Sequence, residues 1–330
     1  MNFWSKLKKP IIVLAPMADV TDASFRRLFA KYGKPDVTWT EFVSADGLIM
    51  APDNNPDNTG LSSKQKLLKD LEYTEAERPI VAQLFSGKPE MMEKAAKLVA
   101  ELGFDGIDIN MGCPDRTIEK QKSGASLIKN PELAKSLVNA ARQGAPHLPI
   151  SVKTRIGYYK TEEMENWISE ILSVKPDALT IHWRTRKEMS LVPAHWELAK
   201  KAVELRDKIS PETILLGNGD IDSLARADEV VKETGVDGVM IGRGIFGNPW
   251  FFNKNIIRDR DISLEEKLKV MVEHTKLFEE ILSHKSFAVM KKHYKAYVEG
   301  FPGAKELRGQ LMEAKTSAEI ENIIMDFLAS

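Results

Sequence analysis

The only cysteine of this 330-residue chain, Cys113, lies in the turn "NMGCPDR", between a glycine and a proline. One cysteine cannot form an internal disulfide, which favours a reducing compartment. A free cysteine is usually a small buried apolar side chain. In a tight turn that follows an apolar run, it is alternatively a reacting group held at the mouth of a site. The residues around the turn must decide between these two interpretations.

Eight short apolar runs, rich in Val, Ile, Leu or Thr, are typical of strands buried on both faces. They cover residues 11–15, 37–40, 80–84, 106–110, 150–154, 178–182, 214–217 and 238–241. The residues at their ends are Pro16 with Met17, Glu41, Gln83, Asn110, Lys153, His182, Asn218 and Gly242 with Arg243. Six of these eight ends carry a polar or charged side chain directly after an apolar run. A shared polar ligand explains this better than unrelated strand caps.

Strand and helix patterns alternate eight times over about 250 residues, which is typical of a (β/α)8 barrel. A doubly wound open sheet is the main alternative, and it usually shows G-x-G-x-x-G after its first strand. Here the first run leads into "APMADVTD", which contains no glycine. We therefore predict an α/β fold, a (β/α)8 TIM barrel, with its site at the carboxyl ends of the strands.

The strand pattern stops near Ser263. Segments 263–282, 286–298 and 317–328 have helical patterns, and "EGFPGAKEL" indicates a turn between the last two. We predict a small C-terminal helical domain, with a catalytic domain over residues 1–258 and the helical domain over 259–330.

Glycine-rich loops, "LGNGDI" and "MIGRGIFGNPW", follow the last two predicted strands. Loops at these two places in a barrel often hold a phosphate, because glycines let backbone N–H groups approach an anion closely. Arg243 would add positive charge. The alternative is that the glycines only form tight turns, but two such loops together favour the phosphate site.

Lys153 and His182 each have a structural and a functional interpretation. An inward-facing lysine is costly to bury without an anion, so Lys153 either pairs internally, for example with Glu41, or stabilises negative charge on a cofactor. His182 is either a core histidine or a site residue. Arg184 and Arg186 follow at alternate positions, so both could point into the mouth of the site.

Composition narrows the class of protein. Apolar residues make up 43% of the chain and charged residues 29%, and the net charge of -1 gives no sign of nucleic acid. No run reaches the roughly 18 apolar residues of a membrane span, and no signal peptide is present, so we expect a cytoplasmic protein. The motifs H-E-x-x-H, C-x-x-C and G-x-S-x-G are absent, so we expect neither a metal site nor a serine nucleophile.

One stretch departs from the charge balance. Residues 281–298 contain no acidic residue but include Lys285, Lys291, Lys292, Lys295, His284, His293, Tyr294 and Tyr297. A basic stretch with interleaved aromatic residues suits phosphate contacts with a folded RNA. The alternative is a solvated helix face. Arg116, Lys120 and Lys122, just after the cysteine turn, could extend such a basic track.

Seven segments resemble, in order and spacing, the motifs of the tRNA-dihydrouridine synthases. They are "APMADVTDASFRRLF", "VAQLFSG", "GIDINMGCPDRTIEKQKSGASLI", "ISVKTRIG", "LTIHWRTR", "LLGNGDI" and "GVDGVMIGRGIFGNPW". The tail segment "MKKHYKAYVEGFPGAKELR" is similar to the C-terminal domain of that family. The resemblance implies an FMN-dependent barrel enzyme that uses NADPH to reduce a uridine of tRNA to dihydrouridine.

The resemblance also implies roles for single residues. Pro16, Met17 and Ala18 match the segment that lines the flavin ring, Gln83 and Lys153 match residues that bond to the isoalloxazine, and His182 matches a histidine near flavin and substrate. Asn218, Gly219, Asp220, Gly242 and Arg243 match the ribityl and phosphate loops. Asn110 matches the asparagine at the substrate base, and Cys113 matches the catalytic cysteine. We expect tRNA contacts from Arg184, Arg186, Lys291, Lys292 and Lys295.

The implied reaction moves a hydride from flavin N5 to C6 of uracil and a proton to C5 from the opposite face. A thiol with an ordinary pKa near 8.5 is mostly protonated near neutral pH, so Cys113 suits the donor role. The uridine must be flipped out, and its unstacking costs a few kcal/mol. The glycine usual in "H-G-R-T" is Trp183 here, which either stacks in the pocket or narrows it.

Two other functions fit parts of the sequence. A flavin-dependent reductase of a free pyrimidine or another small molecule would satisfy the barrel motifs, but the basic helical tail argues against it. A tRNA-binding protein without catalysis is disfavoured by Cys113, Lys153 and both glycine loops. We expect no membrane association and no obligate protein partner, and a monomer.

Overall fold

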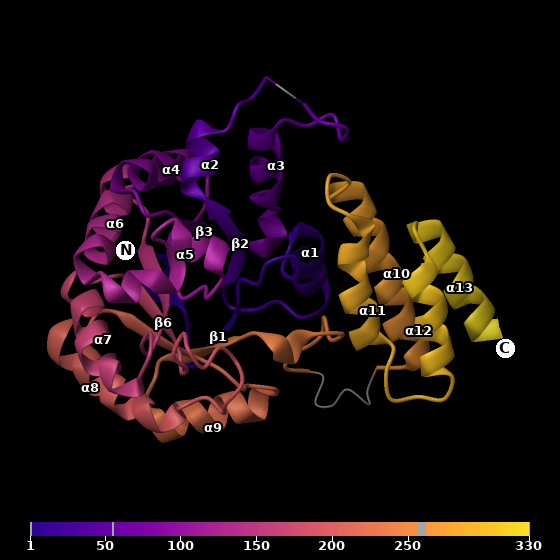
Figure 1. Ribbon diagram of the computed structural model, residues 1–330. Coiled ribbons are helices and arrows are strands. Elements are labelled where there is room, and N and C mark those ends of the chain that lie inside the picture. Colours follow the sequence, from indigo (N-terminus) through magenta and orange to yellow (C-terminus); the bar gives the residue numbers. More distant parts are fainter. Residues whose placement is uncertain (1, 55, 256–261, 330) are drawn as a thin grey trace.

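Eight parallel strands form a barrel with helices around it, and further helices pack on one side of it (Figure 1). This computed structural model describes residues 2–54, 56–255 and 262–329. The predicted TIM barrel followed by C-terminal helices is confirmed. The predicted domain boundary between 258 and 259 lies outside the described residues.

Each predicted run corresponds to one strand. The strands are β1 (Ile11–Leu14), β2 (Thr38–Ser44), β3 (Ile80–Phe85), β4 (Gly106–Met111), β5 (Ile150–Arg155), β6 (Ala178–His182), β7 (Ile214–Asn218) and β8 (Gly238–Ile241). Neighbouring strands pair in the order β1-β8-β7-β6-β5-β4-β3-β2. The cylinder closes because the Leu14 N–H donates to the Val37 carbonyl at 3.4 Å and the Asp36 N–H donates to the Ile12 carbonyl at 2.9 Å. β2 runs to Ser44, past its predicted end, so Glu41 lies within the strand.

Helices cover the outside of the barrel with their apolar faces. They are α1 (Ala23–Tyr32), α2 (Ala45–Met50), α3 (Ser63–Asp70), α4 (Pro89–Glu101), α5 (Arg116–Lys120), α6 (Pro131–Gly144), α7 (Met164–Ser173), α8 (Ala199–Ile209) and α9 (Leu224–Thr234). Short 3-10 segments are η1 (Phe3–Lys6), η2 (Glu75–Glu77), η3 (Gly124–Lys129), η4 (Thr161–Glu163), η5 (Trp196–Leu198), η6 (Arg243–Ile245) and η8 (Phe287–Met290). In α4, helical spacing places Met92, Ala96 and Val99 on one buried face.

The interior of the barrel has an apolar side and a polar side. On the apolar side, Val13 of β1, Leu216 of β7 and Met240 of β8 belong to one buried cluster. On the polar side, β3, β4 and β5 contribute hydrogen-bonded side chains, among them Gln83 and Asp108. Side chains alternate between the two faces of a strand, so the polar residues of β4 point inward while Ile107 and Ile109 pack outward among the helices.

Within the described residues, four helices follow the barrel rather than the three predicted: α10 (Leu264–Ile281), α11 (Lys291–Tyr297), α12 (Ala304–Glu313) and α13 (Ser317–Ala329). The segment predicted as a turn contains the first residues of α12, because the turn ends at Gly303, whose left-handed φ of 80° precedes the helix. The helices share a core that includes Phe278, Tyr294 and Ile320, and Ala23 of α1 joins it from the barrel. None of the helices within the described ranges combines the length and apolar character that crossing a membrane requires.

Candidate active site

A cavity of about 620 Å³ opens at the carboxyl ends of β1, β6, β7 and β8, and its size is that of a cofactor or ligand site. It is lined by nine of the eleven predicted cofactor residues: Pro16, Met17, Lys153, His182, Asn218, Gly219, Asp220, Gly242 and Arg243. Arg184, predicted to contact substrate, lines it as well. Ala18 and Gln83 are not among its lining residues: Ala18 is exposed and Gln83 is fully buried nearby. Strand ends that are far apart in sequence therefore line one cavity.

The two glycine loops pack backbone against backbone in one wall of the cavity. A Cβ atom at Gly244 would lie 2.6 Å from the carbonyl oxygen of Ile221, so only glycine fits there. Gly219 has a φ of 131°, which other residues rarely adopt. The glycines therefore do more than form turns, since they bring the loops after β7 and β8 together around the cavity.

The charges that line the cavity favour an anion. Three lining side chains are cationic, Lys153, Arg184 and Arg243, and two are acidic, Asp220 and Asp222. Asp220 forms ion pairs with Arg184 and, at 3.2 Å, with Arg243. Burial opposes its ionisation, but these contacts hold the pKa of Asp220 below its ordinary value. The remaining positive charge is available to a phosphate.

Lys153 projects into this cavity without an acidic partner. Its Nζ lies 3.3 Å from Asn218 Oδ1, and no carboxylate of the described residues lies within 4 Å. Burial, and then repulsion by Arg155, lowers its pKa to about 8. The alternative of an internal pair with Glu41 is wrong, because Glu41 accepts from Lys285 at 2.8 Å instead. Lys153 is thus a cation whose charge an anionic ligand would stabilise.

His182 lines the cavity as a neutral ring. Burial, and then the charges of Arg155 and Lys153, lower its pKa well below the ordinary value. Its Nε2 lies 3.1 Å from an Arg184 nitrogen, which can only donate, so Nε2 accepts and carries no proton. His182 is therefore a site residue that offers no proton from Nε2.

Trp183 neither stacks in the cavity nor narrows it. Its side chain is fully buried, with its ring centroid 5.7 Å from that of Trp196, and it does not line the cavity. A Cβ atom at Gly217 would lie 2.8 Å from Trp183 Nε1, so the tryptophan occupies space beside β7 that this glycine leaves free.

Asn110 shapes the turn that carries Cys113. Its Oδ1 accepts from the backbone N–H groups of Gly112 at 3.1 Å and Cys113 at 2.9 Å. Its Nδ2 donates to Gln83 Oε1 at 3.0 Å. Gln83 in turn donates to Asp108 Oδ2 at 2.6 Å. This network fixes the half-buried Cys113 beside Lys153, because Asn110 and Lys153 are register partners on β4 and β5.

Two arginines hold the carbonyl groups on either side of Cys113. Arg155 Nε donates to the Gly112 carbonyl at 2.8 Å. Arg186 Nη2 donates to the Pro114 carbonyl at 3.0 Å and pairs with Glu119 at 2.5 Å. Arg186, expected to contact substrate, thus contacts the cysteine turn and does not line the cavity. The prediction missed Arg155, although "VKTR" places it at the alternate position from Lys153, on the same side of β5.

Burial keeps the Cys113 thiol and the Asp108 carboxyl protonated more readily than usual. Burial raises the pKa of Cys113, outweighing the opposite effect of Arg155 and Lys153. Burial also raises the pKa of Asp108 to about 6, despite hydrogen bonds from Gln83 and Ser151. A thiol of raised pKa is a proton donor at neutral pH rather than a nucleophile.

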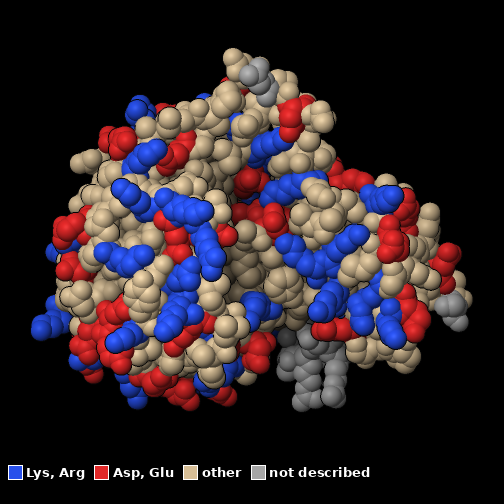
Figure 2. Space-filling model, in the orientation of Figure 1, with Lys and Arg blue, Asp and Glu red and all other residues tan. Residues whose placement is uncertain are grey.

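The basic stretch 281–298 divides into two parts. Lys292 and Lys295 are exposed and Lys291 is half-buried, whereas the aromatic residues expected to meet RNA, Tyr294 and Tyr297, are buried in the helical core. The other expected contributors turn inward too: His293 is buried, and Lys285 and His284 face Asp70. Figure 2 shows Lys and Arg side chains on both sides of the hollow between barrel and C-terminal helices.

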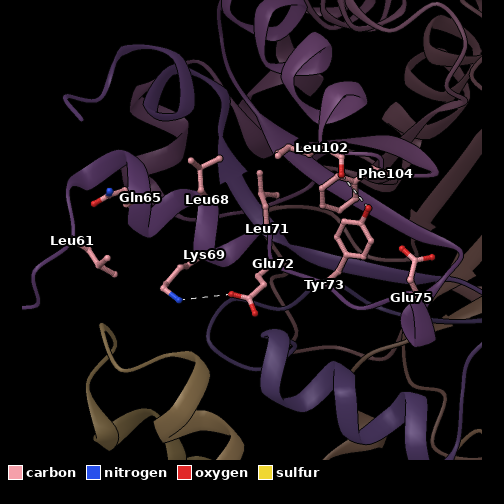
Figure 3. A pocket seen from close by; sticks show the side chains of 10 residues that line it. All are labelled: Leu61, Gln65, Leu68, Lys69, Leu71, Glu72, Tyr73, Glu75, Leu102 and Phe104. Carbon is pink, nitrogen blue, oxygen red and sulfur yellow. Dashed lines mark hydrogen bonds and ion pairs between the residues drawn. The ribbon is translucent and has the colours of Figure 1, made fainter. Parts of the chain in front are cut away.

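A second cavity, also about 620 Å³, lies beside α3 and is lined mainly by apolar side chains (Figure 3). In it, Lys69 faces Glu72 at 3.8 Å, and the Tyr73 hydroxyl donates to the Leu102 carbonyl at 3.1 Å. Tyr73 and Phe104 precede β3 and β4, so this cavity borders the amino ends of strands. It contains none of the predicted site residues.

A cavity with more cationic than acidic lining side chains at the carboxyl end of a (β/α)8 barrel, beside a thiol of raised pKa, is the arrangement of a barrel enzyme with a phosphate-bearing cofactor. The sequence pattern of the dihydrouridine synthase family matches residues 13–329. The chain belongs to the dihydrouridine synthase family. The family and the enzyme class that the sequence predicts, a flavin-dependent oxidoreductase, are thereby confirmed.

Known proteins agree with this assignment. The chain is 41% identical over 328 residues to the probable tRNA-dihydrouridine synthase 2 of Bacillus subtilis, covering 99% of this chain and 96% of that one. It is 40% identical over 330 residues to the probable tRNA-dihydrouridine synthase of Staphylococcus aureus, with the same coverage. Histamine dehydrogenase from Rhizobium sp. 4-9 shares the fold, with a TM-score of 0.51 at 13% identity over 81% of this chain and 48% of that one.

Proposed function

We propose that this chain reduces a uridine of tRNA to 5,6-dihydrouridine, with FMN bound in the cavity and NADPH as the electron donor. The observation that carries the proposal is the position of Cys113, protonated and braced, beside the cavity-lining Lys153 on the neighbouring strand. Membership of the dihydrouridine synthase family and the names of the bacterial relatives support the substrate.

The residues present fit FMN at two points. The close-packed glycine loops and Arg243 suit a phosphate, because they combine backbone N–H groups with an exposed cation. Lys153, which has no acidic partner in the described chain, suits an electron-rich ring above β5. We assign Pro16 and Met17 to the ring, with Ala18 directly after them, and Asn218 to the ribityl chain.

In this proposal, bound FMN that NADPH has reduced would supply a hydride to C6 of the uracil. Cys113 donates its proton to C5 from the other face, and Asn110 keeps the thiol in place through the backbone of the turn. The thiolate left behind is stabilised by the positive charges of Arg155 and Lys153. His182 is neutral and accepts at Nε2, so it orients polar groups rather than supplying this proton.

We assign the tRNA contacts to the hollow between the barrel and the C-terminal helices. Lys291, Lys292 and Lys295 belong to α11 of the C-terminal helices, and exposed basic residues follow the cysteine turn of the barrel, in and directly after α5: Arg116, Lys120 and Lys122 (Figure 1). Residues 1–258 would then be the catalytic domain and 259–330 the tRNA-binding domain. Cations on two sides of a hollow suit the phosphates of a folded RNA.

The test compares two substrates on one protein preparation. Purified protein should show a flavin spectrum and, with NADPH, should form dihydrouridine in unmodified tRNA but not from free uridine. Conversion of free uridine at a comparable rate would favour a small-molecule reductase instead. A colourless protein that cannot be reconstituted with FMN would contradict the proposal.

A further inference from the structure

A buried ion cluster joins the C-terminal helices to the mouth of the barrel. Lys285, between α10 and α11, donates to Glu41 of β2 at 2.8 Å and lies 3.1 Å from Asp70 and 3.7 Å from Asp19. Its side chain is 14% exposed, and that of Glu41 is 7% exposed. Exposed ion pairs contribute little to stability, but removing one partner of a buried pair leaves an uncompensated charge. This cluster therefore ties the C-terminal helices to the barrel.

Glu41 connects Lys285 to the wall of the cavity. Its Oε1 accepts from the backbone N–H of Asp19 at 2.5 Å, while its Oε2 faces Lys285. Asp19 has a φ of 52°, in the left-handed region that residues other than glycine adopt rarely, although Asp does so more readily than most. Asp19 directly follows the segment 16–18, which supplies Pro16 and Met17 to the cavity. One carboxylate thus bridges the helical cation and the cavity loop.

The charges of the cluster depend on Lys285. Burial raises the pKa of Glu41, and Asp22 and Asp70 act in the same direction, whereas Lys285 opposes them. Burial also opposes the charge of Lys285, yet Glu41 and Asp70 keep its pKa above the ordinary value. Without Lys285, Glu41 would bind a proton more readily and hold the Asp19 N–H less strongly.

The C-terminal helices also touch the loop after β8. Gly247 has a φ of 69°, and a Cβ atom there would collide with the carbonyl oxygen of Ala296 in α11. The ring of Phe246 lies 6.0 Å from that of His293. These barrel residues lie three and four positions after Arg243, which lines the cavity. The helices therefore contact segments next to both the β1 wall and the β8 wall of the cavity.

We propose that Lys285 is a positioning residue. Through Lys285, the packing of the C-terminal helices against the barrel determines the conformation of segment 16–19, and this conformation determines the affinity of the cavity for FMN. This inference rests on the proposed function, since FMN is the ligand in question. It makes RNA binding and FMN binding reciprocal: a tRNA that steadies the C-terminal helices tightens FMN binding, and FMN tightens tRNA binding equally.

The experiment titrates FMN into the full-length, flavin-free protein, with flavin fluorescence as the signal. Lys285→Met should raise the Kd for FMN on the order of tenfold, and amide exchange at 17–21 should accelerate. Lys285→Arg, which keeps the charge, should stay near the wild-type Kd. Lys31→Met is the matched control, because Lys31 pairs with Glu273 of α10 at 2.7 Å but contacts no cavity segment; its FMN affinity should be unchanged.

A folded Lys285→Met protein with the wild-type Kd for FMN would overturn the inference. If Lys285→Met fails to unfold cooperatively, Glu41→Gln provides the same test, since it keeps an acceptor for Asp19 but removes the charge that holds Lys285. A wild-type Kd for Glu41→Gln would overturn the inference equally. Wild-type protein that binds no FMN would contradict the proposed function itself, and the inference with it.

Discussion

The two sides of the barrel interior hold different chemistry beneath one mouth. Under the glycine loops, β1, β7 and β8 contribute apolar side chains such as Leu216 and Met240. An anion bound above them would contact the backbone N–H groups of the loops and Arg243. Under Cys113, β3 to β5 offer a chain of directed hydrogen bonds through Gln83 and Asn110. The first arrangement would bind a charge and tolerate small shifts of the ligand, whereas the second places a single sulfur atom. Substitutions should therefore act more sharply on the cysteine side.

The largest effect among the supporting residues is expected at Asn110. Asn110→Ala removes the acceptor of the Gly112 and Cys113 N–H groups, so the thiol shifts and dihydrouridine formation should fall about 100-fold. FMN affinity should not change. The control is Asn130→Ala, which removes a side-chain cap of α6 and should only cost about 1 kcal/mol of stability. Activity of Asn110→Ala close to wild type would remove the distinction between the two sides.

Lys153 should make the stability of the flavin-free protein depend on pH in the alkaline range. In the folded chain its pKa is about 8, against 10.5 as the ordinary value. Between pH 8 and 10.5 the unfolded chain therefore binds up to one more proton than the folded chain, so the free energy of unfolding should rise with pH in this window. Between pH 8 and 9.5 this amounts to about 2 kcal/mol at most. The free energy of unfolding of wild type and of Lys153→Met would be measured with urea at each pH, and the difference between the two isolates the contribution of Lys153. Identical pH profiles would contradict the prediction.

A smaller effect is expected on the glycine side. Gly244→Ala places a methyl group against the Ile221 carbonyl, so the loops must separate and the Kd for FMN should rise about tenfold. Gly309→Ala in α12 is the control, since nothing lies within 4 Å of its added atom. It should leave FMN binding unchanged and raise the free energy of unfolding by about 1 kcal/mol. Equal FMN affinities of the two variants would show that the loop contact is unimportant.

The smallest effect per residue is expected for the lysines of α11, of which Lys292 and Lys295 are exposed and Lys291 is half-buried. Replacing Lys291, Lys292 and Lys295 by Met should weaken tRNA binding severalfold and lower its salt dependence by about two to three units of slope. The control replaces Lys269 and Lys276, which already pair with Glu265 and Glu321. An unchanged salt dependence in the triple variant would mean that α11 presents only a solvated face.

Strands and their end residues could be predicted because burial on both faces leaves a clear apolar run and a clear break after it. β2 departs most from its predicted end, because it continues through Glu41 to Ser44, and the charge of Glu41 is paired there by Lys285. The sequence pattern alone does not show that Lys285 is the partner of Glu41. The predicted turn "EGFPGAKEL" likewise included the first residues of α12, because the φ of Gly303, which fixes where the turn ends, cannot be seen in the sequence.

The contacts of single side chains could not be read from the sequence. The stretch 281–298 contains basic and aromatic residues and no acidic residue, but helix packing buries Tyr294 and Tyr297 and leaves Lys292 and Lys295 exposed. Arg186 alternates with Arg184, yet it turns to Glu119, 67 positions away in sequence. Such pairings depend on how distant elements meet, so spacing indicates a candidate residue but not its partner.

The most direct test of the account is a single turnover with Cys113→Ala. Full-length wild-type and variant proteins would be loaded with FMN and reduced with NADPH in the absence of oxygen. Each would then be mixed with unmodified tRNA, and the amount of dihydrouridine would be measured as a function of time. We predict that both proteins accept electrons from NADPH at the same rate and that the variant forms dihydrouridine about a thousandfold more slowly. Dihydrouridine formation by Cys113→Ala at the wild-type rate would contradict the assignment of this thiol as the proton donor.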